Sequence, residues 1–390
     1  MLQRYSVWAP EAERVDVRLG VDGARVEPMS PDGGGWWSVD AEPGDGRYAF
    51  SLDGGDPLPD PRALPPHLRP ALPVEERDYY AFWRAPRYRW WKGLLAILLA
   101  AFSFLVVSTV LQFIGWSVDG VDLSVLLEGK IPPVGPGFFL ANNISLALCI
   151  PITMLAAWVC VQQRPRWLTS VVGGIRWRWL GLLVAALLPV WVVVIGGSHF
   201  FGPLDEVRVR DYTLVMIVGI LLTTPLQAAG EEYLVRGLLG RAVGSWFRAP
   251  VVGLVASTIV TAVVFMAMHG AGDPWLNAFY LVFAAVGSWA TWRTGGLEAA
   301  IAIHAVHNTV SMALLPFIDF SDMFNREAGV GDATVLIPMA LLLVGAGIVE
   351  FLARRRKPAA TGAPGRRELE SLGLPRPGFG PGPGPMVGPR

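Results

Sequence analysis

Eight apolar segments follow one another between residues 91 and 353, and they restrict the fold more than any other feature of the chain. Most of them approach or exceed the roughly 20 residues that an α-helix needs to cross the hydrocarbon core of a bilayer. Backbone polar groups inside a bilayer must be satisfied within the protein, so spanning segments of this kind are helical. We therefore predict eight transmembrane helices, over 91–116, 137–161, 178–197, 212–240, 250–269, 274–292, 297–316 and 333–353.

The chain divides into four parts by composition. Residues 1–68 contain short apolar–polar alternations separated by Gly, Pro and Asp, which predicts a small antiparallel β-sandwich-like module. Residues 69–85 serve as a linker after a Pro-rich stretch, and the membrane domain covers 86–355. Residues 356–390 form a Pro- and Gly-rich tail that is expected to be disordered. The predicted fold class is an all-α polytopic membrane protein with a small β module in front.

The distribution of charge predicts the orientation in the membrane. The 32 basic residues balance the 32 acidic ones, so the global charge points to no nucleic-acid partner. The individual loops differ in charge. The loop 162–177 and the residue after it contain four arginines, whereas the preceding loop is mainly acidic. The last apolar segment is followed by the basic residues Arg354–Lys357. Basic loops stay in the cytoplasm, so both termini are predicted to be cytoplasmic, in the cell membrane.

Charged residues interrupt the fourth apolar segment, in the stretch Gly230–Arg236, "GEEYLVR". Glu232 and Arg236 are four residues apart with the acid first, the spacing and order that favour an ion pair on a helix. Glu231 lies about 100° round the same helix. A carboxylate without a local cation in an apolar bundle is desolvated, which suits it to act as a general base near neutral pH.

Three of the five histidines fall in or at the ends of apolar segments. His269 closes the fifth segment, and His304 and His307 lie inside the seventh. Asn308 is four residues after His304 and therefore on the same helix face. Three segments thus carry a glutamate, a histidine and a His/Asn pair, which are the groups needed to activate water and to stabilise an oxyanion.

These residues carry a resemblance to a known family. Glu-Glu-x-x-x-Arg, Phe-x-x-x-His and His-x-x-x-Asn, in this order on successive apolar segments, resemble the three motifs of the CPBP family, the CAAX-processing and bacteriocin-processing intramembrane proteases related to the type II CAAX prenyl endopeptidase. The resemblance covers about 86–355 and implies a glutamate-dependent endopeptidase. By motif match, Glu231 and His269 would activate the water, His304 and Asn308 would hold the oxyanion, and Glu232 and Arg236 would shape the site.

The resemblance leaves the metal open. Glutamate and histidine are zinc ligands, so Glu231, His269 and His304 are the candidate ligands if a divalent metal such as zinc is bound. The implied partners are the lipid bilayer and a membrane-embedded or lipid-associated peptide substrate. His307 matches no motif position, and we expect it to have a packing or supporting role.

Two other functions use the same features. The chain can be a non-catalytic membrane scaffold or a bacteriocin-immunity protein of the same fold, in which the Glu232–Arg236 pair is purely structural. It can also be a transporter, because intramembrane charges mark ion paths as well. The sequence shows no evident inverted repeat or pair of broken helices, which counts against a transporter.

The amino-terminal module resembles a second family. Its pattern "VWAP…GWW…YAFSLDGG…PDPR" over about 4–63 is similar to the amino-terminal β-domain of maltooligosyltrehalose trehalohydrolases and glycogen-branching enzymes, a carbohydrate-binding-module-48-like sandwich. The resemblance implies a glucan contact, for which Trp8, Trp36 and Trp37 are the candidate stacking residues. A strand tryptophan is more often a core or interface residue, so both interpretations stand.

Reporter fusions test the predicted orientation. We expect 1–89, the loop 162–177 and the tail 354–390 to report a cytoplasmic location, because Arg164, Arg166, Arg176 and Arg178 resist translocation. An external signal from the loop 162–177 would overturn the orientation.

Overall fold

The structure is a computed structural model. It describes residues 2–20, 25–43, 48–59, 69–126, 132–198, 207–319, 321 and 326–371. Contacts divide the chain into two compact units. The first comprises Met1–Glu76, Ala85–Tyr88 and Ala363–Arg390, and the second comprises Arg77–Arg84 and Arg89–Gly362.

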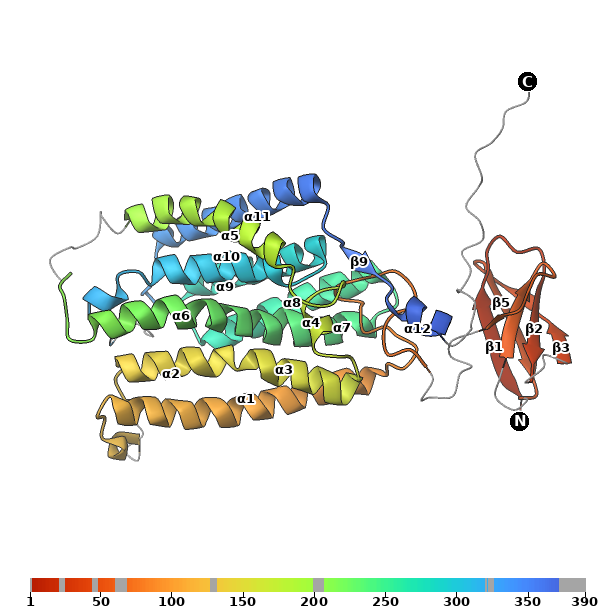
Figure 1. The fold of residues 1–390 in the computed structure, drawn as a ribbon, viewed down its shortest axis with the longest axis horizontal. Coiled ribbons are helices and arrows are strands. Elements are labelled where there is room, and N and C mark those ends of the chain that lie inside the picture. The colour runs from red at the N-terminus through yellow and green to blue at the C-terminus, as the bar shows by residue number, and fades with distance from the viewer. Residues whose placement is uncertain are drawn as a thin grey trace, which may run out of the picture. The chain divides into compact units, whose positions relative to one another are not determined.

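The amino-terminal module consists of two small antiparallel sheets, as the alternation predicts (Figure 1). One sheet has the order β1 (Gln3–Trp8), β5 (Trp36–Ala41), β4 (Ser30–Gly33). The other has the order β3 (Arg25–Pro28), β2 (Val15–Leu19), β6 (Tyr48–Leu52), β7 (Leu58–Pro59). The apolar residues of β2 alternate along the strand and meet the other sheet across a core of Tyr5, Ala9, Val15, Val17, Leu19, Met29, Ala41 and Phe50.

The second unit is helical, and the bounds of its helices agree closely with the apolar segments. α1 is Trp90–Val118; α2 (Pro136–Ala147), α3 (Cys149–Ala156) and η3 (Ala157–Val161) form the second rod; and α5 (Trp177–Trp191) continues into η4 (Val192–Gly196). The fourth rod is α6 (Thr213–Glu232), η7 (Tyr233–Gly240) and α7 (Arg241–Trp246). The remaining long helices are α8 (Pro250–His269), α9 (Pro274–Thr294), α10 (Glu298–Ser311) and α11 (Leu336–Arg356).

Short elements lie between the rods or flank them in the chain. They are the helix α4 (Arg166–Thr169), the helical turns η2 (Leu123–Leu126), η8 (Leu315–Phe317) and η9 (Ala333–Val335), the strands β8 (Arg77–Asp78) and β9 (Thr361–Gly362), and the helix α12 (Gly365–Ser371) of the first unit.

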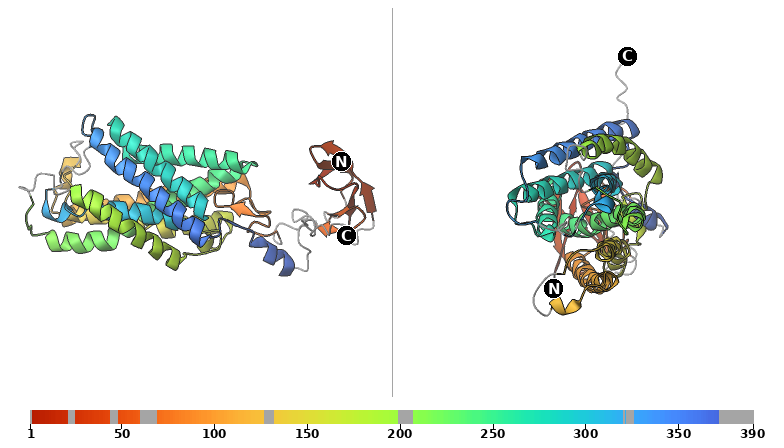
Figure 2. Two further views of the ribbon diagram at one scale, coloured as in Figure 1. Left: turned by 90° about the horizontal axis from the view of Figure 1, so that it is seen from above. Right: turned by 90° about the vertical axis from the view of Figure 1, so that its left-hand side faces the viewer.

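Helices α6 and α10 lie side by side in the middle of the helical unit (Figures 1 and 2). α1 and α2 pack on one side of this pair, and α5 and α11 lie on the other. The two helices that carry most of the motif residues are therefore surrounded by other helices. This placement removes their charged side chains from lipid, as bilayer energetics require.

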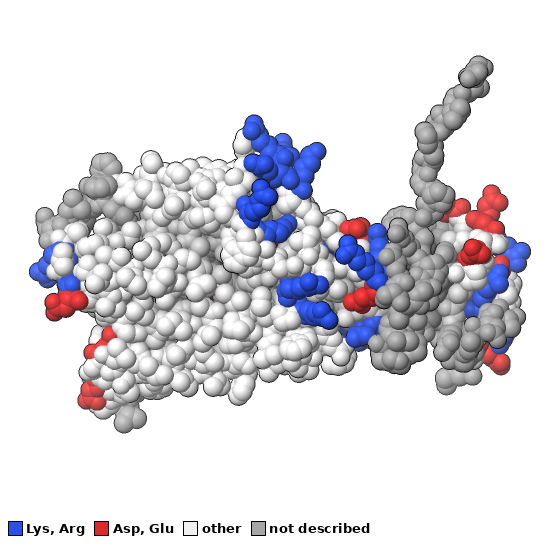
Figure 3. All heavy atoms as spheres, in the orientation of Figure 1, with Lys and Arg blue, Asp and Glu red and all other residues white. Residues whose placement is uncertain are grey.

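The helical unit is apolar outside and polar inside. Large side chains such as Leu98, Phe102, Leu222 and Val193 are exposed, whereas Asn143, Gln227 and many serines and threonines are buried. Figure 3 shows the visible side of the unit as uncharged along its middle, with basic and acidic side chains gathered toward its ends. This distribution is the reverse of a water-soluble domain and fits a protein whose solvent is lipid.

The prediction of eight spanning helices is confirmed in part. In the described residues, seven helices are long and apolar enough to cross a membrane. The eighth, α9, has 21 residues but is not among them. Its sequence contains tryptophans, a tyrosine, Asn277 and Arg293, which lower its hydropathy, and much of its surface is covered by α8, α10 and α11.

The parts around the helical unit also differ from prediction. Residues 77–84, expected within a linker, belong to the helical unit, where Tyr79, Tyr80 and Trp83 are at most 1% exposed. The tail expected to be disordered from 356 is structured as far as Ser371, because β9 pairs with β8 and α12 follows. Residues 77–84 join the helical unit because their aromatic side chains are buried in it. The chain up to Ser371 is ordered because its backbone forms hydrogen bonds. Residues 372–390 lie outside the described residues.

A buried ion pair fixes the start of α10. Both carboxylate oxygens of Glu298, which is fully buried, accept from the Arg176 guanidinium at 2.9 and 2.6 Å, and one of them also accepts from the Arg176 backbone N–H. The same guanidinium donates to the carbonyl oxygens of Thr294 and Ala359. A bidentate ion pair of this kind fixes the relative position of the two side chains and is also stronger than a single hydrogen bond. Arg176 therefore ties together the end of α9, the start of α10 and the strand segment after α11.

Two deletions test the role of the segment 77–84. Removing 1–75 should leave the melting temperature of the helical unit in detergent unchanged, because this segment stays. Removing 1–84 should lower it by more than about 5 °C, because each buried aromatic ring lost costs about 3 kcal/mol or more. Equal melting temperatures for the two truncated proteins would show that the segment is not part of the core.

Asp273 gives a pH-dependent prediction. Burial tends to raise its pKa, but hydrogen bonds from the backbone N–H groups of Leu276, Gly331, Gly329 and Trp275 outweigh burial and hold the pKa below its ordinary value of 3.8. A depressed pKa in the folded state stabilises the fold fully above the ordinary pKa. That contribution is lost as the pH falls through the folded-state value.

Asp273→Asn should therefore melt below the wild type at pH 7. The difference should shrink toward zero on acidification below about pH 3. Melting curves across this range check it, and a difference that grows in acid would contradict it.

Candidate functional site

The motif glutamates lie where α6 changes its geometry. Glu231 and Glu232 are the last residues of α6, and the chain continues as the π-helix η7, a form that occurs frequently at functional sites. Gly230 permits this position, since a Cβ there would overlap the carbonyl oxygen of Leu146 on α2. Close backbone approach through small residues is typical of membrane helix contacts. The packing of α6 on α2 therefore sets the depth and direction of both carboxylates.

Glu232 is the centre of the charged cluster. Its Oε1 accepts from Arg236 Nη1 at 3.0 Å and lies 2.8 Å from His304 Nδ1. The expected ion pair between Glu232 and Arg236 is thus present, with both side chains at 0% exposure. The structure adds His304 from α10 as a second partner, which the spacing along one helix could not indicate. Because a carboxylate only accepts, Nδ1 of His304 carries the proton.

Arg236 is held by a ring as well as by a carboxylate. Its guanidinium carbon lies 4.6 Å from the centre of the Phe265 ring, a cation–π distance. A Cβ at Gly287 on α9 would lie 3.2 Å from one of its nitrogens, so the missing side chain makes the room. Within the described residues, Glu232 Oε2 and the Nε and second NH of Arg236 have no hydrogen-bond partner. Buried orphan groups of this kind are rare and call for an explanation, such as an unseen water or a function.

Glu231 has a different environment from its neighbour. Its side chain is 10% exposed, and its Oε2 lies 3.6 Å from His304 Nε2. Its other oxygen accepts from the amide of Gln227 one turn earlier, and Gln227 in turn accepts from Asn308 Nδ2 at 3.2 Å. Glu231, Gln227 and Asn308 therefore form a chain from α6 to α10. His304 lies between the two glutamates and faces each with a different nitrogen.

His269 is placed by aromatic packing. Its Nδ1 lies 2.7 Å from the carbonyl oxygen of Phe265, which can only accept, so this nitrogen carries the proton. In the neutral ring, Nε2 is then the free lone pair. The ring stacks on Tyr280 at 3.9 Å, and Phe265 lies 4.6 Å from His269 and 6.0 Å from His304. One phenylalanine thus separates the two histidines.

The structure brings most of the predicted site residues together. Glu231, Glu232, Arg236, His304 and Asn308 form one hydrogen-bonded or charged group, and His269 joins it through Phe265. Sequence reasoning missed Gln227 and Phe283, which lies 4.7 Å from His304. Gln227 is four residues before Glu231, so a polar residue one turn away in an apolar segment was an available signal.

The candidate metal ligands do not form a metal site. Among the residues that the structure describes, no three His, Cys, Asp or Glu side chains are arranged to hold a metal ion. One nitrogen of His304 is bonded to Glu232, and one of His269 to a backbone carbonyl.

The tryptophans of the amino-terminal module have unequal exposure. Trp8 and Trp36 face each other across β1 and β5 and are 58% and 42% exposed, whereas Trp37 is partly buried. The indole N–H of Trp8 donates to the carbonyl oxygen of Gly34, and that of Trp37 to Ala9. Trp8 and Trp36 therefore present an open aromatic pair, and a glucan contact through it stays a prediction.

The two adjacent glutamates should differ in their effect on stability. Glu232→Gln strands the buried Arg236 cation, which typically costs 3–5 kcal/mol, so melting in detergent should fall clearly below the wild type. Adding Arg236→Leu should recover part of the loss. Glu231→Gln should melt close to the wild type, because an amide oxygen at 231 can still accept from Gln227. Equal decreases in melting temperature for the two single variants would contradict the different roles of the two glutamates in the cluster.

Comparison with known proteins agrees with this site. A family model described as "Type II CAAX prenyl endopeptidase Rce1-like" matches residues 212–310, the range that holds every motif residue. The uncharacterized protein YyaK of Bacillus subtilis is 24% identical over 291 residues, which cover 70% of this chain and 92% of that protein. No solved structure matches the chain.

The amino-terminal part matches a different protein. Malto-oligosyltrehalose trehalohydrolase of Arthrobacter ramosus is 38% identical over 69 residues, which are 16% of this chain and only 12% of that enzyme. The likeness to the trehalohydrolase is thus limited to a short segment. The family match and the charged cluster fall in the same part of the chain: residues 212–310 form an Rce1-like type II CAAX prenyl endopeptidase domain, of the CPBP kind.

Proposed function

We propose that the protein is a glutamate-dependent endopeptidase that hydrolyses peptide bonds of membrane-associated proteins or peptides inside the bilayer. The observation that carries the proposal is the unequal pair of glutamates around one histidine. Glu232 is fully buried and doubly paired, whereas Glu231 is slightly exposed and faces the other nitrogen of His304. The Glu232 carboxylate is therefore held by its two partners, and the Glu231 carboxylate is available to accept a proton.

Glu231 is the proposed general base. It takes a proton from a water molecule, and the water oxygen attacks the carbonyl carbon of the peptide bond. His269 supports this step, because its Nδ1–H donates to the Phe265 carbonyl oxygen and its Nε2 lone pair can then accept from the same water. The proton on Glu231 then passes to the nitrogen of the leaving amine as the carbon–nitrogen bond breaks. The two products are a carboxylic acid and an amine, with no other reactant than water.

His304 and Asn308 are the proposed oxyanion donors. The Nδ1–H of His304 donates to the Glu232 carboxylate, which fixes the orientation of the ring. In its protonated form, His304 has a second proton, on Nε2, that it can donate to the oxyanion. Asn308 donates one amide hydrogen to Gln227 and has a second one free for the oxyanion. Both donors come from α10, one turn apart, so they can converge on one oxygen. Glu232 and Arg236 position His304 and do not react themselves.

The proposed location is the cell membrane, with both termini in the cytoplasm. This orientation requires that α9 cross as well, because eight crossings return the chain to its starting side. Support comes from its 21 residues, about 31 Å of helix, and from its packing along α8 and α10. Membrane proteins tolerate a less apolar helix where neighbours cover it.

A measurement of peptide cleavage by the Glu231→Gln variant distinguishes a protease from a non-catalytic protein. In proteoliposomes with a membrane-anchored reporter peptide, we expect kcat to fall by about 10²–10⁴, the usual loss when a general acid–base group is removed. Glu350→Gln is the matched control: it removes a glutamate of α11 whose pairs with Arg293 and Arg354 are partly exposed, so activity should stay within about twofold. Full activity of Glu231→Gln would remove the proposed base.

The alternatives predict different outcomes of the same experiment. A scaffold or immunity protein releases no product in wild-type vesicles, at any protein concentration. A transporter changes the ion or solute content of sealed vesicles, and Glu231→Gln abolishes that flux without a change in peptide length.

A further inference from the structure

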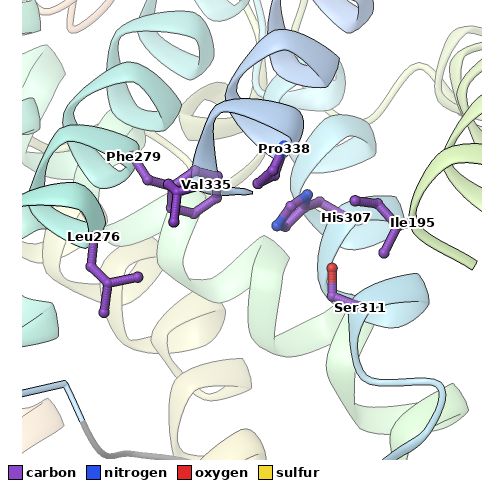
Figure 4. Close-up of a pocket in the computed structure, with 7 residues that line it drawn as sticks. All are labelled: Ile195, Leu276, Phe279, His307, Ser311, Val335 and Pro338. Carbon is purple, nitrogen blue, oxygen red and sulfur yellow. The ribbon is translucent and has the colours of Figure 1, made fainter. Parts of the chain in front are cut away.

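A small hollow lies beside the candidate site on α10. It has a volume of about 210 Å³ and is lined by Ile195, Leu276, Phe279, His307, Ser311, Val335 and Pro338 (Figure 4). Glu231, His269 and Asn308 are not part of its lining. Its walls come from η4, α9, α10, η9 and α11, and of these the catalytic proposal takes residues from α10 alone.

The polar groups of the hollow are two donors on one helix. Trp191 Nε1–H can only donate, and it lies 3.2 Å from His307 Nδ1. Nδ1 therefore has the lone pair, and in the neutral ring the proton is on Nε2. Within the described residues, neither this Nε2–H nor the Ser311 hydroxyl has a hydrogen-bond partner. Trp191 thus fixes His307 as a donor in an otherwise apolar hollow.

One aromatic ring, Phe283, contacts both His304 of the candidate site and His307 of the hollow. Phe283 lies 4.7 Å from His304 and 5.6 Å from His307. The two histidines are three residues apart on α10, so their Cβ atoms are about 5–6 Å apart. An extended peptide advances about 3.3 Å per residue, so this offset corresponds to about two residues of a bound peptide.

We propose that the hollow is a specificity subsite. It receives one bulky apolar side chain of the peptide substrate, about two residues from the cleaved bond, and His307 Nε2–H donates to a main-chain carbonyl oxygen of that residue. The inference rests on the proposed function. The volume is below the range of whole-ligand pockets and suits a single side chain. A lipid chain alone would leave both donors unsatisfied at a cost of about 1–3 kcal/mol each, whereas a peptide has the carbonyl that is required.

Cleavage of paired reporter peptides tests the subsite. The peptides differ only by Leu or Ala at the position two residues from the cleaved bond, on either side. The wild type should prefer Leu by about tenfold or more in kcat/KM at one of these positions. Ser311→Leu fills the hollow and should bring the Leu-to-Ala ratio close to one. Ala313→Leu adds the same bulk at an exposed position of the next turn and should keep the ratio.

Loss of the donor gives a second readout. His307→Phe should raise KM for both peptides and leave kcat nearly unchanged, because the hydrogen bond is formed equally in the ground and transition states. A Leu-to-Ala ratio that survives Ser311→Leu overturns the subsite, even if Glu231→Gln is inactive as the proposed function requires.

Binding can be measured without cleavage. Cys149 and Cys160 are buried, so Ser311→Cys introduces an accessible thiol against a low background. The Leu peptide should slow maleimide labelling of this thiol several-fold, and the Ala peptide should slow it less. Equal labelling with both peptides, or stronger protection by oleate vesicles alone, would overturn the subsite. The labelling rates can be measured whether or not any peptide is cleaved. A result that contradicts the subsite can therefore be told apart from a result that contradicts the protease proposal.

Discussion

The ion pair between Glu232 and Arg236 is the interaction on which the rest of the helical unit depends. Both side chains are fully buried in a bundle whose outer surface is apolar. An uncompensated charge in such surroundings is strongly destabilising, so each partner requires the other. The pair also fixes the chain around it: Gly287 leaves room for the guanidinium, Phe265 covers it, and His304 bonds to the carboxylate. Five helical elements, α6, η7, α8, α9 and α10, thus meet at one charge pair.

The same pair explains how two identical neighbours can differ. Adjacent residues on a helix point about 100° apart, so Glu232 faces the charged centre while Glu231 faces Gln227 and the outer nitrogen of His304. The environment assigns one carboxylate to structure and leaves the other with some access to water. Differences of this kind between paired carboxylates are how enzymes separate a reacting group from its support.

Aromatic rings provide the second level of organisation. Phe265 contacts His269 and His304, Phe283 contacts His304 and His307, and Tyr280 stacks on His269. Each of these three histidines has one nitrogen engaged: His269 with a carbonyl, His304 with Glu232 and His307 with Trp191. The engaged nitrogen fixes the tautomer and leaves the other with a defined role as donor or acceptor. Rings of this size also exclude water and lipid, which strengthens the remaining polar contacts. The bundle therefore sets both the position and the proton of each imidazole.

The amino-acid sequence by itself determined the elements, because apolar length and helical spacing are local properties. It predicted the bounds of the helices to within a few residues, the Glu232–Arg236 pair and the small β module. Only the tertiary structure decided which helices meet. His304 bonds to Glu232 across 72 positions of the chain, and Asn308 reaches Gln227 across 81, and no local pattern encodes such distances. It also decided the burial of Tyr79–Trp83 and the order of the chain to Ser371, since both arise from partners far away in the sequence.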